Sequence, residues 1–424
     1  MHTFTGICPT KSIRIESFSK LGDSIYFEEE GEAPGLYIIQ YISSSLDWKS
    51  GQIVINQKVD PVVSSDPYLQ VTLTFSPNEG SSQASTLNLR IPFWTHLEGA
   101  TATINCQSLA IPAPELVWNL LIGIFGGNPG VIFNILLLMQ KMEQYKLSLQ
   151  LPISLRTEAI QDDRPQYASI QAILYGPYLL AGHTSGDWNL KSGSAESLSD
   201  SITPIPASYN EQLISFSQDS GNLTFVLTNS NQSITMEEYP KSGTDACLQA
   251  TFRIVLNESS PSEVFGIIDV IGKSVMLEPF DLPGMLLAQQ GTDGSLAVTN
   301  SADDDGSSIF RVVSGLDGKD GTVSLESGSQ AGCYICSGVN YKPGQSMKLS
   351  CESGSSDTGF NQGASFVMNK GLSEYHPISF VAKGDNRNFL LAPLHSLRDE
   401  FYTIYFNIQA LTCVDRAIDS MIGK

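Results

Sequence analysis

The cysteines are the side chains whose spacing most directly suggests chemistry. Cys333 and Cys336 are separated by two residues, and Cys351 follows fifteen residues after Cys336. Thiolates at this spacing can bind zinc, but a zinc site needs about four ligands, and no fourth ligand lies near these three. Thiols can also form a disulfide or pack as small apolar side chains. We therefore expect structural thiols or one local disulfide, and no metal site.

Paired carboxylates could carry out a second kind of chemistry, the hydrolysis of glycosidic bonds. Acidic residues occur in runs at residues 28–30, 162–163 and 237–238. Each run is typical of a charged surface turn. No Ser-His-Asp spacing, phosphate-binding loop or metal-ligand cluster stands out elsewhere in the sequence. The sequence therefore predicts no catalytic residue, no metal site and no cofactor.

The strands that would position a site are repeated in the C-terminal part of the chain. Similar openings occur at residues 275–278, 323–326 and 378–381, which lie 48 and 55 residues apart. Each copy closes on a strand with an aromatic residue, namely Phe310, Phe366 or Tyr405. Cys333 and Cys336 occupy strand positions that ordinary residues fill in the other copies. Three units of short strands without a helical period favour a closed threefold barrel, the β-trefoil.

This repeat resembles the arabinose-binding domain at the C-terminus of fungal α-L-arabinofuranosidases. The resemblance rests on Ser324-Leu325, on residues 332–335 and on Ala364-Ser365-Phe366. It implies a β-trefoil carbohydrate-binding module at residues 273–410, followed by a short tail at residues 411–424.

The resemblance also implies which side chains bind the sugar. In that family each competent lobe offers a His after the Tyr-Leu strand and an Asp before the Ser-Phe strand. The third copy has His395 and Asp399, and the first copy has Asp305, although none of the copies matches the pattern cleanly. We expect His395 and Asp399, and then Asp305, to bind carbohydrate. The alternative is that these side chains are solvated loop residues.

The N-terminal half of the chain has the pattern of a β-sandwich. Short alternating segments are separated by turns rich in Pro, Asp and Gly, as in sandwich folds. We expect strands at residues 35–42, 52–57, 68–75, 86–91, 147–151, 168–174 and 178–182. A polar segment follows, and then further strands at residues 213–216, 223–227, 233–237 and 248–256. The fold class is therefore all-β, with a β-sandwich region followed by a C-terminal β-trefoil.

These segments resemble the plant members of the β-L-arabinofuranosidase family, which also end in an arabinose-binding trefoil. The matching stretches are residues 15–27, 89–94 and 175–182. The resemblance implies a sandwich at residues 15–184, a linker with accessory strands at residues 185–272, and a divergent N-terminus at residues 1–14.

Two features of that family are missing from this chain. The family has an N-terminal helical barrel, and its zinc-bound nucleophile is a cysteine in a Cys-Cys-(Tyr)-Gly-Thr motif. Here Pro9 and Thr10 occupy the paired-cysteine positions, and Cys8 is out of register with them. Cys8 has no nearby group to lower its thiol pKa. The family's catalytic cysteine therefore has no counterpart.

Residues 116–140 form an anomalous apolar stretch, in which residues 116–139 carry no charge. That length would suit a membrane span. However, Gly126-Gly127-Asn128-Pro129-Gly130 divides the stretch into two short halves. We expect an insertion that displaces a strand of the sandwich, with a buried helix or a membrane span as the alternatives.

Composition and charge limit the partners of the chain. The net charge of −20 argues against nucleic acid and against an anionic membrane surface, because both require a positive footprint. A neutral polysaccharide is compatible with this charge. Residues 1–14 do not form a signal peptide, although the sequons at Asn222, Asn231 and Asn257 are typical of secreted proteins. The resembled family is extracellular or located in the cell wall.

We interpret the chain as a truncated arabinofuranosidase-family protein that lacks the catalytic barrel and the cysteine nucleophile. Its expected function is binding of arabinose- or arabinan-type cell-wall polysaccharide. Two alternatives stay open. The chain is either an active arabinofuranosidase that hydrolyses terminal L-arabinofuranosyl residues, or a non-functional truncated product.

Overall fold

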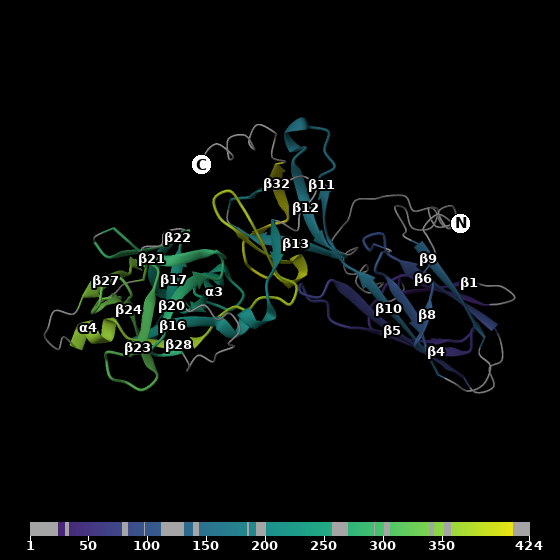
Figure 1. The fold of residues 1–424 in the computed structure, drawn as a ribbon, viewed down its shortest axis with the longest axis horizontal. Coiled ribbons are helices and arrows are strands. Elements are labelled where there is room, and N and C mark those ends of the chain that lie inside the picture. The colour runs from purple at the N-terminus through teal and green to yellow at the C-terminus, as the bar shows by residue number, and fades with distance from the viewer. Residues whose placement is uncertain are drawn as a thin grey trace. The chain divides into compact units, whose positions relative to one another are not determined.

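The chain is built almost entirely from β-strands (Figure 1). A computed structural model describes residues 24–29, 34–78, 84–96, 98–111, 131–138, 144–184, 186–191, 201–256, 270–291, 293–300, 306–338, 343–351 and 358–409. The chain divides into two compact units, Met1–Ser154 and Leu155–Lys424. The prediction of an all-β chain is confirmed.

The first unit contains two sheets, which bury alternate side chains. In β5 the side chains of Leu69, Val71, Leu73 and Phe75 are buried, whereas those between them are partly exposed. This alternation places one face of the strand against a core. The four-stranded sheet has the order β1 (Tyr26–Glu29), β2 (Gly35–Ile38), β6 (Ala84–Ile91) and β9 (Val131–Leu138). The six-stranded sheet has the order β3 (Ser44–Trp48), β4 (Ile53–Val59), β5 (Tyr68–Pro77), β10 (Tyr145–Pro152), β7 (Thr101–Ile104) and β8 (Gln107–Leu109).

The second half of the apolar stretch at residues 116–140 is a strand. Antiparallel pairing joins β9 to β6, from Val131 opposite Ile91 to Leu138 opposite Ala84. For these eight residues the helix and membrane-span interpretations were wrong, because pairing with β6 satisfies the peptide groups that a helix would satisfy internally. Residues 116–130 and 139–140 lie outside the described residues. In the described part of the chain, no helix is long and apolar enough to cross a membrane.

The second unit contains a nine-stranded sheet built from two distant parts of the chain. Its aromatic core packs edge to face, with ring centroids 5.0 Å apart for Tyr175 and Phe380 and 5.9 Å apart for Phe389 and Phe406. The earlier strands are β11 (Leu155–Ala159), β12 (Ile170–Tyr175), β13 (Tyr178–His183), β14 (Asn189–Lys191) and β15 (Ile202–Pro204). The later strands are β29 (Phe380–Ala382), β30 (Phe389–Pro393), β31 (Tyr402–Thr403) and β32 (Tyr405–Gln409).

The thirteen-stranded sheet of the second unit lies between these two parts in the sequence. It consists of three consecutive groups of strands. The first group is β16 (Leu213–Ser220), β17 (Leu223–Ser230), β18 (Ser233–Glu238) and β19 (Phe252–Leu256). The second group is β20 (Ser274–Pro279), β21 (Met285–Gln290), β22 (Ser295–Asn300) and β23 (Phe310–Ser314). The third group is β24 (Thr322–Ser327), β25 (Cys333–Cys336), β26 (Gln345–Ser346), β27 (Lys348–Cys351) and β28 (Phe366–Lys370).

Six strands of this sheet close into a ring. The first strand of each group pairs with the last strand of the group before it, so that β20 pairs with β19, β24 with β23, and β16 with β28. The pairs β16–β19, β20–β23 and β24–β28 complete the circle. Fully buried rings of Phe216, Phe252, Phe310 and Phe366 fill its interior. Six of the seven remaining strands form three pairs, β17–β18, β21–β22 and β25–β27, and β26 pairs with β18. Short helices accompany the sheets at α3 (Asp245–Gln249), α4 (Thr358–Gly363), η3 (Pro165–Tyr167), η5 (Ala207–Gln212) and η7 (Leu394–Ser396).

The ring groups its strands differently from the sequence repeat. Residues 213–256, which we expected to be accessory strands, supply its first group. The third copy of the repeat instead lies in the nine-stranded sheet, where β30 pairs with β13 and β29 pairs with β15. A short buried strand has the same apolar pattern whichever sheet it joins, so its pattern does not specify its partner.

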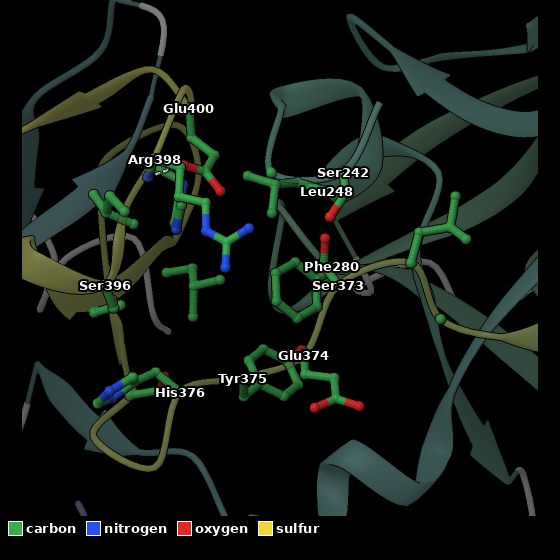
Figure 2. A pocket seen from close by; sticks show the side chains of 18 residues that line it. Ser242, Leu248, Phe280, Ser373, Glu374, Tyr375, His376, Ser396, Arg398 and Glu400 are labelled. Atoms are coloured by element: carbon green, nitrogen blue, oxygen red, sulfur yellow. Dashed lines mark hydrogen bonds between the residues drawn. The ribbon is translucent and has the colours of Figure 1, made fainter. Parts of the chain in front are cut away.

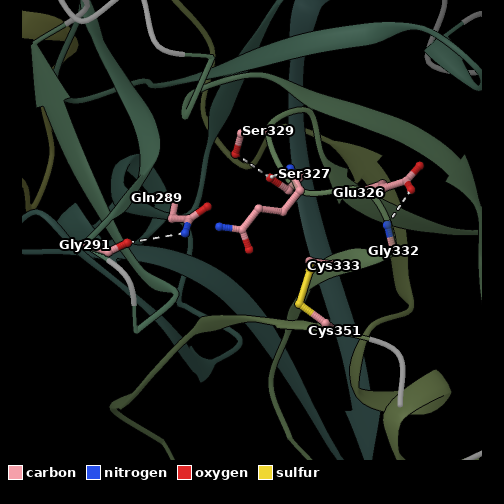
Figure 3. Close-up of a disulfide and its surroundings, with 9 residues drawn as sticks. Gln289, Gly291, Glu326, Ser327, Ser329, Gly332, Cys333 and Cys351 are labelled. Carbon is pink, nitrogen blue, oxygen red and sulfur yellow. Dashed lines mark hydrogen bonds between the residues drawn. A yellow bond between two sulfur atoms is a disulfide. The ribbon is translucent and has the colours of Figure 1, made fainter. Parts of the chain in front are cut away.

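A disulfide joins Cys333 of β25 to Cys351 of β27, which face each other in the strand register (Figure 3). The prediction of one local disulfide is thereby confirmed for this pair. Cys336 is buried, and its sulfur accepts a hydrogen bond of 3.4 Å from the backbone N–H of Gly338. Nearby, the backbone N–H of Gly332 donates a hydrogen bond of 3.0 Å to Glu326 (Figure 3).

Candidate functional site

A cavity of about 540 Å³ opens where the nine-stranded sheet meets the ring. We call it the Asp281 cavity. Its volume lies in the range typical of small-molecule sites. The side chains that line it are mostly polar, and one exposed aromatic ring joins them. The lining residues are His183, Thr184, Asn229, Asn231, Gln232, Thr244, Asp245, Ala246, Leu248, Gln249, Asp281, Leu282, Arg387, Asp399 and Phe401.

A tight turn between β17 and β18 forms one wall. Asn231 and Gln232 both have positive φ angles, 49° and 67°, as a two-residue type I′ hairpin turn requires. The side chain of Asn229 accepts a hydrogen bond of 3.1 Å from the backbone N–H of Gln232. Its amide nitrogen donates a hydrogen bond of 3.2 Å to Asp281. The turn therefore fixes the orientation of the amide beside the Asp281 carboxylate.

Asp281 follows β20 in the turn that leads to β21. Burial raises the pKa of its carboxyl group to about 6, although the hydrogen bond from Asn229 and the charge of Arg387 oppose the shift. A carboxyl group with such a pKa changes its protonation state within the mildly acidic range. Depending on pH, it can therefore either donate or accept a hydrogen bond in the cavity.

Arg387 joins the two sheets at the wall of the cavity. Its Nη2 donates hydrogen bonds to the carbonyl oxygens of His183, at 2.8 Å, and of Asp281, at 3.3 Å. Burial lowers its pKa, and the charges of Asp281 and Asp187 counteract that shift. An arginine keeps its charge in proteins under such conditions. The guanidinium thus brings a fixed positive charge and further N–H donors to the cavity.

His183 lies on β13, and its side chain is buried. Burial lowers the pKa of its imidazole to about 4; the charge of Glu400 raises it and the charge of Arg387 lowers it further. The ring is therefore neutral near pH 7. Its Nδ1 has no hydrogen-bond partner among the described residues. A neutral imidazole with a free nitrogen can accept or donate one hydrogen bond.

The rim of the cavity is formed by the loop that precedes β31. Asp245 of α3 accepts hydrogen bonds of 2.9 Å and 3.2 Å from the backbone N–H of Phe401. The backbone N–H of Asp399 donates a hydrogen bond of 3.2 Å to the carbonyl oxygen of Gly243. These contacts fix the loop, while the ring of Phe401 is 67% exposed. An exposed ring beside fixed polar groups can pack against the apolar face of a ligand.

The structure separates the residues that we expected to bind sugar. Asp399 lines the Asp281 cavity. His395 lies in η7, with its ring centroid 6.0 Å from that of Tyr178, and it does not line the cavity. Asp305 lies outside the described residues.

The sequence did not indicate Asn229, Asp281, Arg387 or His183 as site residues. No motif or repeat position distinguishes them from other polar residues near strand ends, and the four are up to 204 residues apart. Only the strand pairing brings them together. Among the described residues, no group of three or more His, Cys, Asp and Glu side chains could hold a metal ion.

Comparison with protein families identifies one matching region. Residues 35–116 match the family model described as the middle domain of GH127 β-L-arabinofuranosidases. This region lies in the first unit, whereas the Asp281 cavity lies in the second. A comparison with curated protein sequences gave no match.

Several solved structures are similar to parts of the chain. One is Ara127N-Se, a GH127 β-L-arabinofuranosidase from Geobacillus stearothermophilus T6, with 17% identity and a TM-score of 0.30 over 59% of this chain. The chain spans only 31% of that enzyme's length. A GH54 α-L-arabinofuranosidase soaked with a cyclic sulfate inhibitor has 12% identity and a TM-score of 0.30, over 76% of this chain and 53% of that one. The designed threefold symmetric protein ThreeFoil has 16% identity and a TM-score of 0.25, over 37% of this chain and 96% of that one.

Proposed function

We propose that the chain binds arabinose-containing saccharides through the Asp281 cavity, as an arabinofuranosidase-related protein. The observation that carries this proposal is that the hydrogen-bonded residues Asp281, Asn229 and Arg387 line one cavity together with the exposed ring of Phe401. Ring hydroxyls of a sugar need donors and acceptors in fixed positions, and the apolar face of the sugar packs on an aromatic ring. The family match of residues 35–116 supports arabinose as the sugar.

We further propose that the architecture is a β-sandwich followed by a β-trefoil. The two sheets of the first unit support a sandwich, and the ring of six strands with three attached strand pairs supports a trefoil. In this interpretation the trefoil spans the three strand groups from β16 to β28. The Asp281 cavity then lies at the edge of the trefoil, and we place the protein outside the cell, where such polymers occur.

The test is calorimetric titration of the whole chain with arabinan and with arabinoxylan. We expect binding to be lost or weakened about tenfold in Asp281→Asn and Asp399→Ala, the effect of losing a hydrogen bond to a charged group. Asp320→Ala, which changes an exposed carboxylate outside the cavity, is the matched control. Equal binding by all four proteins would refute the cavity as the site.

Arabinofuranosidase activity is the second candidate, and the raised pKa of Asp281 favours it. Asp245 and Asp399 line the same cavity. Glycoside hydrolysis uses two carboxyl groups, one of which donates a proton to the leaving group. Release of arabinose from an aryl arabinofuranoside, abolished by Asp281→Asn, would establish hydrolysis. Binding without any release of arabinose would leave the chain as a binding protein.

A further inference from the structure

A second cavity of about 410 Å³ lies next to the Asp281 cavity, and we call it the Arg398 cavity (Figure 2). His183 and Leu248 line both cavities and thus form the partition between them. The loop that precedes β31 serves both sites, because Arg398 lines the second cavity and Asp399 lines the first. Two adjacent side chains therefore belong to two different cavities.

Polar groups without partners converge in the Arg398 cavity. The Arg398 guanidinium points into the cavity toward the hydroxyls of Ser242 and Ser373 (Figure 2). Arg398 is an exposed residue, and its guanidinium N–H groups are available as donors to a ligand. Ser379 also lines the cavity, and its hydroxyl is fully buried without a partner in the described part of the chain. The Nδ1 of His183 is in the same situation. Buried polar atoms in native proteins are nearly always paired, so a ligand or water is expected here.

An aromatic surface forms another side of the Arg398 cavity. The rings of Phe280 and Tyr375 stack with centroids 4.4 Å apart and an angle of 24° between their planes (Figure 2). The amide of Asn210 fixes the backbone of Tyr375 through hydrogen bonds of 2.7 Å and 3.0 Å. This surface is rigid and largely apolar. Phe280 and Tyr375 are only 2% and 5% exposed, so the stacked rings hold this wall in place and leave the contacts with a ligand to the polar groups of the cavity.

The charges that face the Arg398 cavity favour a neutral ligand. Glu374 and Glu400 line it together with Arg398. Glu374 pairs with Lys370, and Glu400 accepts a hydrogen bond from the backbone N–H of Arg398. With Lys370 beside Glu374, the charges around the cavity balance, so an anionic ligand gains no net attraction that would offset the loss of its hydration. These charged groups can nevertheless accept and donate hydrogen bonds to uncharged hydroxyls.

We propose that the Arg398 cavity binds a second, neutral sugar residue, independently of the sugar bound in the Asp281 cavity. The proposal takes its ligand class from the proposed function, but apart from His183 and Leu248 it rests on side chains that do not line the Asp281 cavity. The chain would then hold a polysaccharide at two points. Binding at two linked points strengthens the overall attachment to a polymer without any additional contact.

The test follows the imidazole proton signals of the whole chain by NMR during titration with L-arabinose, D-xylose and D-galacturonate. His376 lines only the Arg398 cavity, and His96, which lies in the first unit, is the internal control. We expect the His376 signals to shift with the two neutral sugars and the His96 signals to stay constant. Galacturonate should bind about tenfold more weakly, because its carboxylate loses water without gaining a net positive charge in the cavity.

The adjacent pair Arg398→Gln and Asp399→Asn separates the two cavities. Arg398→Gln should weaken the His376 isotherm about tenfold, whereas Asp399→Asn should leave it unchanged. A constant His376 signal, an equal effect of the two variants, or tighter binding of galacturonate would overturn the proposal. If His376 responds to xylose but not to arabinose, the Arg398 cavity takes a sugar other than arabinose, and the proposed function is still tested separately by the titrations of the Asp281 cavity.

Discussion

A buried ion pair beside the two cavities allows a quantitative prediction. Arg253 of β19 and Glu278 of β20 face each other in register, with Nη2 and Oε2 2.5 Å apart. Their side chains are only 12% and 9% exposed. The Arg253 guanidinium also lies 4.0 Å over the ring of Tyr209, and it donates a hydrogen bond of 3.2 Å to Gln212. The pair therefore joins two ring strands to η5.

Replacing one partner of this ion pair should lower the free energy of unfolding far more than replacing both. Glu278→Leu leaves a buried cation without its counter-charge, and we expect it to lower the free energy of unfolding by about 3–5 kcal/mol. Arg253→Met leaves a buried carboxylate and should cost about as much. In the double variant no buried charge is left unpaired. Its cost should be only about 1–2 kcal/mol, mainly from the lost contact with Tyr209.

Native-state hydrogen exchange of the β19 and β20 amides measures this free energy within the ring itself. The four proteins form a double-mutant cycle, and we expect a coupling energy of about 3 kcal/mol or more. The exposed pair Arg156–Glu158 provides a control, because Glu158→Leu should cost less than about 1 kcal/mol. The reasoning is refuted if Glu278→Leu costs no more than this control, or if the two single effects add without coupling.

Three further predictions concern single sites. Replacing Cys333 and Cys351 with serine opens a loop closed over 18 residues, and should lower the urea-unfolding free energy by about 3 kcal/mol. The pKa of His183 falls from 6.5 to about 4 on folding, so the free energy of unfolding should decrease by roughly 3 kcal/mol as the pH falls from 6.5 to 4. In His183→Leu this decrease should be smaller when unfolding is measured across the same pH range. In Gly182→Ala the new Cβ would lie 2.7 Å from Phe406, and we expect a loss of about 1–3 kcal/mol in thermal unfolding.

Each of these measurements has its own control or contrary outcome. Cys106→Ser changes an exposed free thiol and should leave stability unchanged. Gly186→Ala adds a methyl group with no atom within 4 Å, so the same substitution there should be nearly neutral. The raised pKa of Asp281 has the opposite effect on the pH dependence of stability. Its contribution to the free energy of unfolding is present below pH 3.8 and is lost as the pH rises through about 6. An acid loss in His183→Leu equal to that of the unmodified chain would show that His183 is not its cause.

The sequence predicted individual strands better than their partners. The segments read as strands at residues 52–57, 68–75 and 178–182 correspond to β4, β5 and β13. Their alternation and flanking turns are local signals, and a local signal is sufficient to form a strand. The third copy of the repeat shows the limit, because β30 has the apolar pattern of the ring strands but pairs with β13.

The candidate site was harder to predict for the same reason. Asp399 was expected, and it lines the Asp281 cavity. Arg387 and Asp281 carry no local signal, because charged residues between two strands usually belong to a solvated turn. Their contact across 106 residues depends on the way in which the ring and the nine-stranded sheet meet. That arrangement follows from the whole set of strand pairs rather than from any one segment.

In the sequence, the ring lies between the two parts of the nine-stranded sheet, and this order affects how the protein folds during synthesis. Strands β12 and β13 leave the ribosome long before β30 and β32, with which they pair. The ring can fold in the interval, and its two ends meet where the N–H of Gly371 donates a hydrogen bond of 2.9 Å to the carbonyl oxygen of Leu213. Until β30 and β32 are synthesised, β12 and β13 keep open edges, which promote aggregation. A nascent chain stalled before residue 380 should therefore need a chaperone, even though its ring is complete.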